Sequence, residues 1–109
     1  MSDCLFCKIA AGTIPVTRMD EDDASLAFAD INPQSPTHLL LIPKQHYANA
    51  AEAPAEVLGP LFAKAAAIGK RKLPGGYRIV VNTGDDGGQT VHHLHLHILG
   101  GRHMGWPPG

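Results

Sequence analysis

Residues 93–98 alternate histidine with leucine or isoleucine, and this alternation constrains the fold more than any other feature of the sequence. In a β-strand, successive side chains point to opposite faces. The alternation therefore predicts a strand over residues 91–99 that buries the intervening apolar side chains in the core. His93, His95 and His97 are then expected to line an outer surface or cleft on the other face.

The other segments predict an α+β fold, and the length of 109 residues favours a single domain over residues 1–109. We expect helices to cover one face of an antiparallel sheet. Pro60 predicts either a kink in the main helix or a separate short turn before it. The expected elements are a helix at 5–11, a turn at 20–23, strands at 25–30, 39–42 and 77–82, and an amphipathic helix carrying Leu58, Leu61, Ala65 and Ile68 and ending near residue 72.

Charge and hydropathy exclude two classes of partner. Nine Lys and Arg residues face ten Asp and Glu residues, and the one basic cluster, residues 70–72, is too short to indicate duplex DNA. The longest apolar run, residues 39–42, is far too short to span a membrane. The N-terminus has no basic segment followed by a long apolar stretch, so we expect a cytoplasmic protein. In that reducing compartment Cys4 and Cys7 suit metal ligation or no special role, rather than a disulfide.

Closely spaced imidazoles suppress one another's protonation, which leaves neutral rings at pH 7. Such a row can ligate a metal, or it can attack and bind a phosphate group. The glycine-rich loop of residues 83–88 allows backbone N–H groups to approach an anion, and Thr90 adds a hydroxyl. The simpler interpretation of this loop is a hairpin turn, since its two aspartates would repel an anion. Single histidines are usually solvated or satisfied in the core, which is how we interpret His38, His92 and His103.

The segment GGQTVHHLHLHILGG, residues 87–101, resembles the His-φ-His-φ-His-φ-φ signature of the histidine triad superfamily, in which φ is apolar. Further similar segments are CLFCKIAAGTIP, LAFADINPQSPTHLLLIPKQH, YRIVVNTGDDGG and the tail GWPPG, so only the middle helix is not diagnostic. The tail and the third histidine resemble the nucleotide-binding Hint branch. The resemblance implies an antiparallel sheet of about five strands with one main helix and a short N-terminal helix.

The resemblance also implies a hydrolase that acts on purine nucleoside phosphoramidates, such as adenosine 5'-monophosphoramidates, or on aminoacyl adenylates. His95 matches the nucleophile that attacks the α-phosphorus and becomes nucleotidylated. His97 matches a phosphate contact, His93 a residue that orders the site, and Thr90 a contact to phosphate or leaving group. Asp30 matches the carboxylate that accepts the ribose hydroxyls, although alone it would be interpreted as a turn cap. The positions expected to bind substrate are Phe28, Asp30, Ile31, Asn82, Gly88, Gln89 and Trp106.

The same resemblance implies a structural zinc ion, no redox cofactor and an AMP-type purine nucleotide as the small-molecule partner. Cys4 and Cys7 resemble a pair that, in part of the superfamily, binds zinc together with histidines matching His46 and His93. The alternative is two buried thiols without a ligand. The apolar tail around Trp106 is similar to a segment that reaches the partner's active site in a symmetric homodimer, and the alternative is a loosely ordered tail on a monomer.

Three other functions remain open at this point. A non-catalytic module could bind purine nucleotides or proteins and use the triad only to hold phosphate. A dinucleoside polyphosphate hydrolase would use the same residues. A cupin-type metalloenzyme built on His95 and His97 would need a carboxylate ligand a few residues later, and the sequence has none between Ile98 and Gly109.

Overall fold

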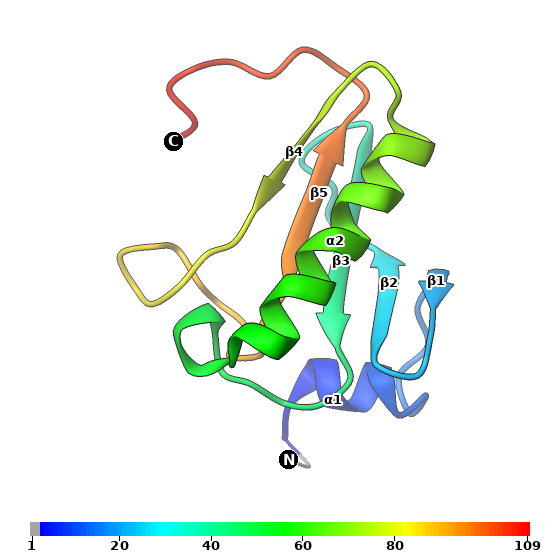
Figure 1. The fold of residues 1–109 in the computed structure, drawn as a ribbon, viewed down its shortest axis with the longest axis vertical. Coiled ribbons are helices and arrows are strands. Elements are labelled where there is room, and N and C mark those ends of the chain that lie inside the picture. The colour runs from blue at the N-terminus through cyan, green and yellow to red at the C-terminus, as the bar shows by residue number, and fades with distance from the viewer. Residues whose placement is uncertain (1–2) are drawn as a thin grey trace.

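The computed structural model describes residues 3–109, and in this part of the chain five antiparallel strands form one sheet with a helix on each face (Figure 1). The expected α+β class, with one main helix and a short N-terminal helix, is confirmed. The elements are α1 (Leu5–Ala10), β1 (Arg18–Glu21), β2 (Ser25–Ala29), β3 (Thr37–Pro43), a 3-10 turn (Ala50–Glu52), α2 (Ala55–Lys72), β4 (Tyr77–Val80) and β5 (Leu96–Gly100).

The strand order is β1-β2-β3-β5-β4, so the last strand lies between β3 and β4. In this register His97 of β5 lies opposite Leu40 of β3 and Val80 of β4. The apolar neighbours of His97, Leu96 and Ile98, point to the opposite face and are fully buried. The alternation in the sequence therefore places His97 on one face of the sheet and the leucine-rich core on the other.

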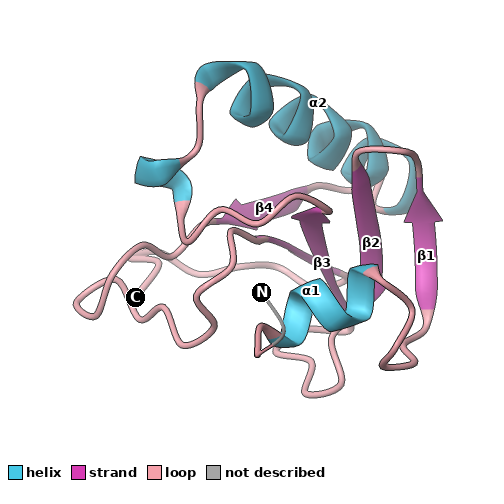
Figure 2. Ribbon diagram, turned by 90° about the horizontal axis from the view of Figure 1, so that it is seen from below, coloured by secondary structure: helices cyan, strands magenta, loops and turns pink. Residues whose placement is uncertain are grey.

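Helix α2 covers the core face, as its apolar spacing predicts (Figure 2). Apolar residues three and four apart share one side of a helix, and burying that side stabilises an otherwise marginal structure. The buried residues of this core are Ala27, Leu39, Leu41, Leu61, Ala65, Ile68, Leu73, Leu94, Leu96 and Ile98.

Helix α1 lies against the other face of the sheet, so the expectation that helices cover only one face is wrong (Figure 2). Its buried residues Phe6 and Ile9 pack with Leu26, Phe28 and Leu40 in a second, smaller core. The reason is that β2 and β3 are apolar on both faces, as the burial of every residue from Leu39 to Pro43 shows. A sheet with apolar side chains on both faces must pack against other elements on both sides to bury them.

Helix α2 is continuous through Pro60, in place of the expected kink or separate turn. It begins at Ala55, so Pro60 lies early in the helix and leaves only the carbonyl of exposed Glu56 without its usual i+4 donor. Three basic residues, 70–72, occupy the last turn, where the helix dipole favours cations. Across residues 3–109, no helix combines the length and the apolar character that crossing a membrane would require.

The final strand begins at Leu96, which corrects the expected start at residue 91. Its neighbour β3 ends at Pro43, and the carbonyl of Pro43 accepts a hydrogen bond from the ring of His93. Beyond that point Leu94 donates its N–H to the carbonyl of Tyr47 at 2.7 Å, outside the sheet. His93 and His95 are therefore on an extended segment that leads into β5.

Candidate active site and metal cluster

A cavity of about 310 Å³ lies between α1 and the sheet, and six of the residues expected in the site line it. This volume is in the range of cavities that bind small molecules. The lining is mostly apolar, with a few polar groups at one end. The six expected residues are Phe28, Asp30, Ile31, Thr90, His95 and His97.

His95 is held in one tautomer by its own segment of chain. Its Nδ1 donates a hydrogen bond to the carbonyl of His93 at 2.7 Å, so in the neutral ring the other nitrogen, Nε2, carries a free lone pair. The ring of Phe6 packs against it edge-on, with 5.0 Å between ring centroids. Burial lowers the pKa of His95, which keeps the ring neutral and the lone pair free at pH 7.

A chain of three groups sets the tautomer of His97. The backbone N–H of Gln34 donates to His38 Nδ1 at 3.0 Å, which leaves the proton of the neutral His38 ring on Nε2. That proton is donated to His97 Nδ1 at 2.8 Å, so His97 carries its own proton on Nε2. Within residues 3–109 the Nε2 atom of His97 is buried and has no hydrogen-bond partner. This arrangement offers an unused N–H donor at the wall of the cavity.

The environment of His97 favours the neutral ring. Burial lowers its pKa to about 4, and the neighbouring His95 and His38 rings contribute in the same direction. The pKa of His38 is lowered as well, mainly by burial, although Asp30 acts in the opposite direction. The two imidazoles that line the cavity, those of His95 and His97, are therefore uncharged at pH 7 and have fixed donor and acceptor nitrogens.

Asp30 both caps a turn and faces the cavity. Its Oδ1 accepts the N–H of Asn32 at 2.8 Å, and its Oδ2 lies 3.4 Å from His38 Nε2. Asp30, His38 and His97 are close enough to be considered as metal ligands. The 2.8 Å between the two imidazole nitrogens, however, is shorter than the roughly 3.3 Å expected between two ligands of one zinc ion. A hydrogen bond explains this contact better.

His93 is separated from the cavity and instead belongs to a cluster with Cys4, Cys7 and His46, which we call the thiol cluster. Its ring is fully buried, which corrects the expectation that all three triad rings line an outer surface or cleft. Its Nε2 donates to the carbonyl of Pro43 at 2.8 Å, so its Nδ1 carries a lone pair toward the cluster. The four ligand atoms all lie within 4.8 Å of one another.

The spacing of the thiol cluster fits a tetrahedral metal ion. Ligand bonds of about 2.0 to 2.3 Å place neighbouring donors about 3.3 to 3.8 Å apart. The His93 Nδ1 atom lies 3.2 Å from Cys4 Sγ, 3.5 Å from Cys7 Sγ and 3.2 Å from His46 Nδ1. Cys7 Sγ lies 3.4 Å from His46 Nδ1. Two sulfurs and two imidazole nitrogens are a typical donor set for structural zinc.

The glycine-rich loop before the triad closes on itself. Gly84 donates its N–H to the side chain of Gln89, and Gly88 donates to the carbonyl of Asp85. The buried Gln89 amide also donates to the carbonyls of Ala48 and Val91. Two of the backbone donors that were expected to face an anion are thus used within the loop, and the side chain of Gln89 is part of its framework. Gly88 does not line the cavity.

Two further expected residues lie outside the cavity in this chain. Asn82 follows β4 and does not line it. Trp106 is 83% exposed and lies near the guanidinium of Arg78, 6.0 Å from the ring centroid. Of the histidines that we interpreted as ordinary, His92 and His103 are exposed, whereas His38 is buried in the polar end of the site.

The hydrogen bond of His38 to His97 and most of the apolar wall were not expected from the sequence. No local pattern marks His38, because its partner His97 is 59 residues away in the sequence. The apolar wall comes largely from α1 and the segment after it, whose residues have the composition of ordinary core. The residues of the wall that were not expected are Leu5, Phe6, Ile9, Ile14, Pro15, Val16, Ala29, Leu40 and Val91.

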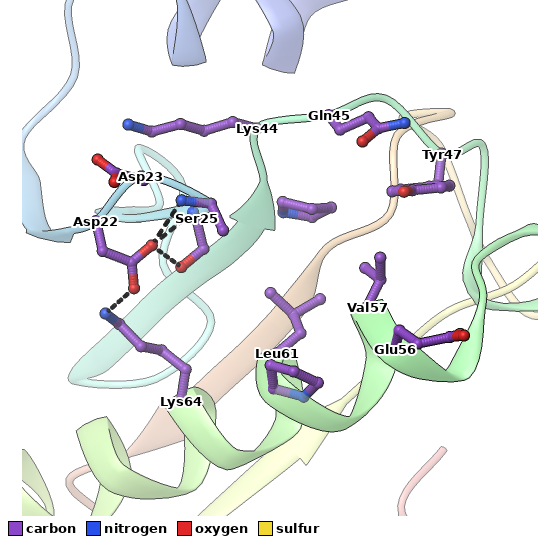
Figure 3. A pocket seen from close by; sticks show the side chains of 13 residues that line it. Asp22, Asp23, Ser25, Lys44, Gln45, Tyr47, Glu56, Val57, Leu61 and Lys64 are labelled. Atoms are coloured by element: carbon purple, nitrogen blue, oxygen red, sulfur yellow. Dashed lines mark hydrogen bonds and ion pairs between the residues drawn. The ribbon is translucent and has the colours of Figure 1, made fainter.

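A second cavity, of about 350 Å³, lies on the opposite side of the sheet between α2 and the end of β3 (Figure 3). None of the expected site residues lines it. Asp22 pairs with Lys64 at 2.6 Å and accepts hydrogen bonds from Ser25, as the dashed lines in Figure 3 show. The ion pair lowers the pKa of Asp22 and raises that of Lys64. The charges of Asp22 and Lys64 are therefore paired with each other.

Comparisons with known proteins agree with this arrangement. The chain is 48% identical to a 14 kDa zinc-binding protein of Zea mays, over 99% of this chain and 89% of the relative. It is 46% identical to adenylylsulfatase HINT1 of Arabidopsis thaliana, over 99% and 78%. The crystal structure of a HIT family hydrolase from Legionella pneumophila superposes with a TM-score of 0.94 at 49% identity, over 98% of this chain and 100% of that one. Since the model of the HIT domain also matches residues 11–104, the chain belongs to the HIT domain family.

Proposed function

We propose that this protein is a nucleoside phosphoramidase that hydrolyses adenosine 5'-monophosphoramidates or aminoacyl adenylates through a nucleotidyl-His95 intermediate. The observation that carries the proposal is the fixed tautomer of His95, whose Nε2 lone pair belongs to a buried, neutral ring in the wall of the cavity. A neutral imidazole is a good nucleophile at pH 7 and a good leaving group afterwards. The hydrolase and adenylylsulfatase named among the relatives support a reaction at a nucleotide phosphorus.

The reaction consists of two displacements at the α-phosphorus. In the first, Nε2 of His95 forms a bond to phosphorus, the phosphorus–nitrogen bond of the amidate breaks, and the amine leaves with a proton taken from solvent. In the second, water attacks phosphorus, the bond to His95 breaks, and AMP is released with a proton lost to solvent. The proposed role of the Nε2–H of His97, which has no hydrogen-bond partner within the described residues, is to donate to a phosphate oxygen, where charge builds up in both steps.

The remaining cavity residues suit the nucleoside. The apolar side chains of Phe28 and Ile31, together with α1, would surround the base, while Asp30 would accept the ribose hydroxyls. Capping the turn uses one acceptor position of Asp30, and a carboxylate has about four. Thr90, which is exposed and also lines the cavity, would donate its hydroxyl to the leaving group. Asn82, Gly88 and Gln89 do not line the cavity. We still propose that they contact the substrate, and these contacts remain to be tested.

The test is a panel of substrates that share an adenylyl group and differ in the leaving group. Adenosine phosphoramidate, an aminoacyl adenylate, adenosine 5'-phosphosulfate and diadenosine polyphosphates are compared by their kcat/KM. We expect the phosphoramidate or the aminoacyl adenylate to react fastest. Binding of AMP without turnover of any of the four would support the non-catalytic alternative. Preferred cleavage of a diadenosine polyphosphate would support the polyphosphate hydrolase instead.

We also propose that Cys4, Cys7, His46 and His93 bind a structural zinc ion, as the name of the Zea mays relative suggests for that protein. With four protein ligands such a site has no open position, so it would tie α1 to the sheet and take no part in the hydrolysis. His93 is then a ligand and not a proton carrier.

Elemental analysis of protein purified without added metal should find about one zinc per chain, as four protein ligands imply. Cys7→Ser should reduce this content strongly, because it removes one of two thiolates. His92→Gln, which changes an exposed histidine next to the cluster, is the matched control and should keep the zinc. A wild-type protein that contains no zinc and gains none when zinc is added would contradict the proposal.

A symmetric homodimer is proposed from the aromatic residues at one edge of the molecule. Phe62 and Tyr77 are 41% and 37% exposed, and the Tyr77 hydroxyl donates to the carbonyl of Ala66, one turn from Phe62 on α2. Trp106 lies near Arg78, the next residue of β4. Strand β4 pairs only with β5, so its other edge is free among the described strands. An apolar surface of this kind beside a free edge suits a second copy of the chain.

Light scattering at micromolar concentration should give the mass of a dimer. Removing residues 105–109 should change the preference among the four substrates, because the tail would reach the partner's cavity. The same truncation should have little effect on the midpoint of thermal unfolding. A monomer mass, or a truncated protein with unchanged preferences and a lowered unfolding midpoint, would contradict this assembly.

A further inference from the structure

His93 takes part in two networks, one through its ring and one through its backbone. Its Nδ1 atom lies 3.2 Å from both Cys4 Sγ and His46 Nδ1 in the thiol cluster. Its carbonyl oxygen accepts the Nδ1 proton of His95 at 2.7 Å. The ring is fully buried, and Pro43 holds its other nitrogen. A metal ion that fixes this ring therefore also fixes the carbonyl that orients His95.

Helix α1 makes a second connection between the thiol cluster and the cavity. Cys4 caps this six-residue helix and Cys7 lies in its first turn. Between them, Phe6 packs edge-on against the ring of His95, with an interplanar angle of 89°. Leu5 and Phe6 both line the cavity. Because a helix this short is not stable by itself, its position depends on the groups that anchor it.

We propose that metal binding to the thiol cluster and nucleotide binding to the cavity are positively coupled, so that each raises the affinity of the protein for the other. This inference rests on the proposed function and adds a regulation of the same site. Ordering α1 and the segment around His93 costs conformational free energy, and the ligand that binds second meets a wall that is already ordered. By linkage, the factor is the same in both directions.

Cys4 and Cys7 are then positioning residues. They act on His95 and on the apolar wall through α1 and His93, without touching the nucleotide. The larger core, between α2 and the sheet, contains none of the four ligands, so removing the metal leaves that core in place. The coupling is therefore measurable in a protein that stays folded.

The first measurement compares the affinity for AMP of zinc-loaded protein and of protein stripped with a chelator, by isothermal titration calorimetry. Circular dichroism confirms that the stripped protein is folded. We expect the stripped protein to bind AMP about tenfold more weakly, within the usual range of allosteric coupling. Equal affinities would overturn the coupling and leave the proposed function intact. A loaded protein that does not bind AMP would instead overturn the proposed function.

The second measurement starts from the loaded protein and tests the coupling from the zinc side, while circular dichroism confirms that the protein stays folded as zinc is removed. Zinc is titrated out with a chromophoric chelator of known affinity, with and without saturating AMP. We expect AMP to raise the zinc affinity by the same factor of about ten. Inorganic phosphate at the same concentration is the control for direct binding of zinc by phosphate. An unchanged zinc affinity would overturn the proposal.

A variant separates coupling from simple stabilisation of the fold. Phe6→Leu keeps all four ligands of the thiol cluster but removes the ring that contacts His95. It should keep the zinc affinity measured without AMP and reduce the coupling factor toward one. Ile68→Val removes one carbon from the larger core on α2, away from the thiol cluster and the cavity, and should leave the factor at about ten. A Phe6→Leu protein with the full factor would exclude α1 as the connection and overturn this part of the inference.

Discussion

Replacing His95 with alanine is expected to lower the turnover of adenosine phosphoramidate by about a thousandfold or more, because it removes the attacking group and with it the two-step route. Affinity for AMP should change little, since the apolar wall, Asp30 and His97 remain. His92→Ala changes an exposed neighbour in the same segment and should keep full activity. Single-turnover kinetics and calorimetry measure the two quantities separately.

The variant at His97, two residues after His95, provides a comparison for the effect on turnover. His97→Ala removes a donor to the phosphate and leaves the nucleophile, so its cost should be smaller, about a hundredfold. Mass spectrometry of acid-sensitive adducts on wild-type protein should find the nucleotidyl group on His95. Undiminished turnover by the His95→Ala protein would exclude the proposed mechanism.

The free energy of unfolding is expected to decrease as the pH falls from about 6.5 to about 4, in part because of His97 and His38. In the unfolded chain a histidine binds a proton near pH 6.5. In the folded protein burial lowers the pKa of His97 to about 4, and it also lowers the pKa of His38. Between these values the unfolded state binds more protons, so acid favours unfolding. For His97 alone the loss is about 2 to 3 kcal/mol.

Urea unfolding of wild type and His97→Gln at several pH values between 7 and 4.5 tests this expectation. The variant should lose less stability over this range, because glutamine does not titrate. Both proteins keep Cys4, Cys7 and His46, so any acid release of zinc affects them equally. His103→Gln, at an exposed position, should keep the wild-type pH dependence. Identical pH dependence in the wild type and His97→Gln would show that His97 does not stabilise the protein in this way.

The burial of Leu94, Leu96 and Ile98 in one core and the position of His97 on the other face of the sheet could be predicted, because alternation is a local property of a strand. The burial of His95 could not be predicted, since it is caused by α1, whose Phe6 covers His95 from a distant part of the sequence. The same limit applies to the hydrogen bond between His38 and His97, which depends on the pairing of β3 with β5.

The conformation of the glycine-rich loop could not be predicted for a different reason. Glycine allows several conformations, and which of them forms depends here on Gln89, whose side chain binds the backbone on both sides of it. The C-x-x-C pair was informative because its two sulfurs and the rings of His46 and His93 are one donor set brought together by the fold. The sequence offered both the metal and the unligated interpretation, and the spacing of the four ligand atoms favours the first.

The position of β5 between β3 and β4 has a consequence for biosynthesis. Strand β4 pairs with β5 alone, and β3 reaches β4 only through it, so a nascent chain that ends before Leu96 has an incomplete sheet. The same late segment supplies His93, His95 and His97. A nascent chain therefore cannot bring the triad histidines into place before this segment has left the ribosome. Closure of the sheet and completion of the site occur together, through contacts between distant parts of the chain that form slowly compared with local ones.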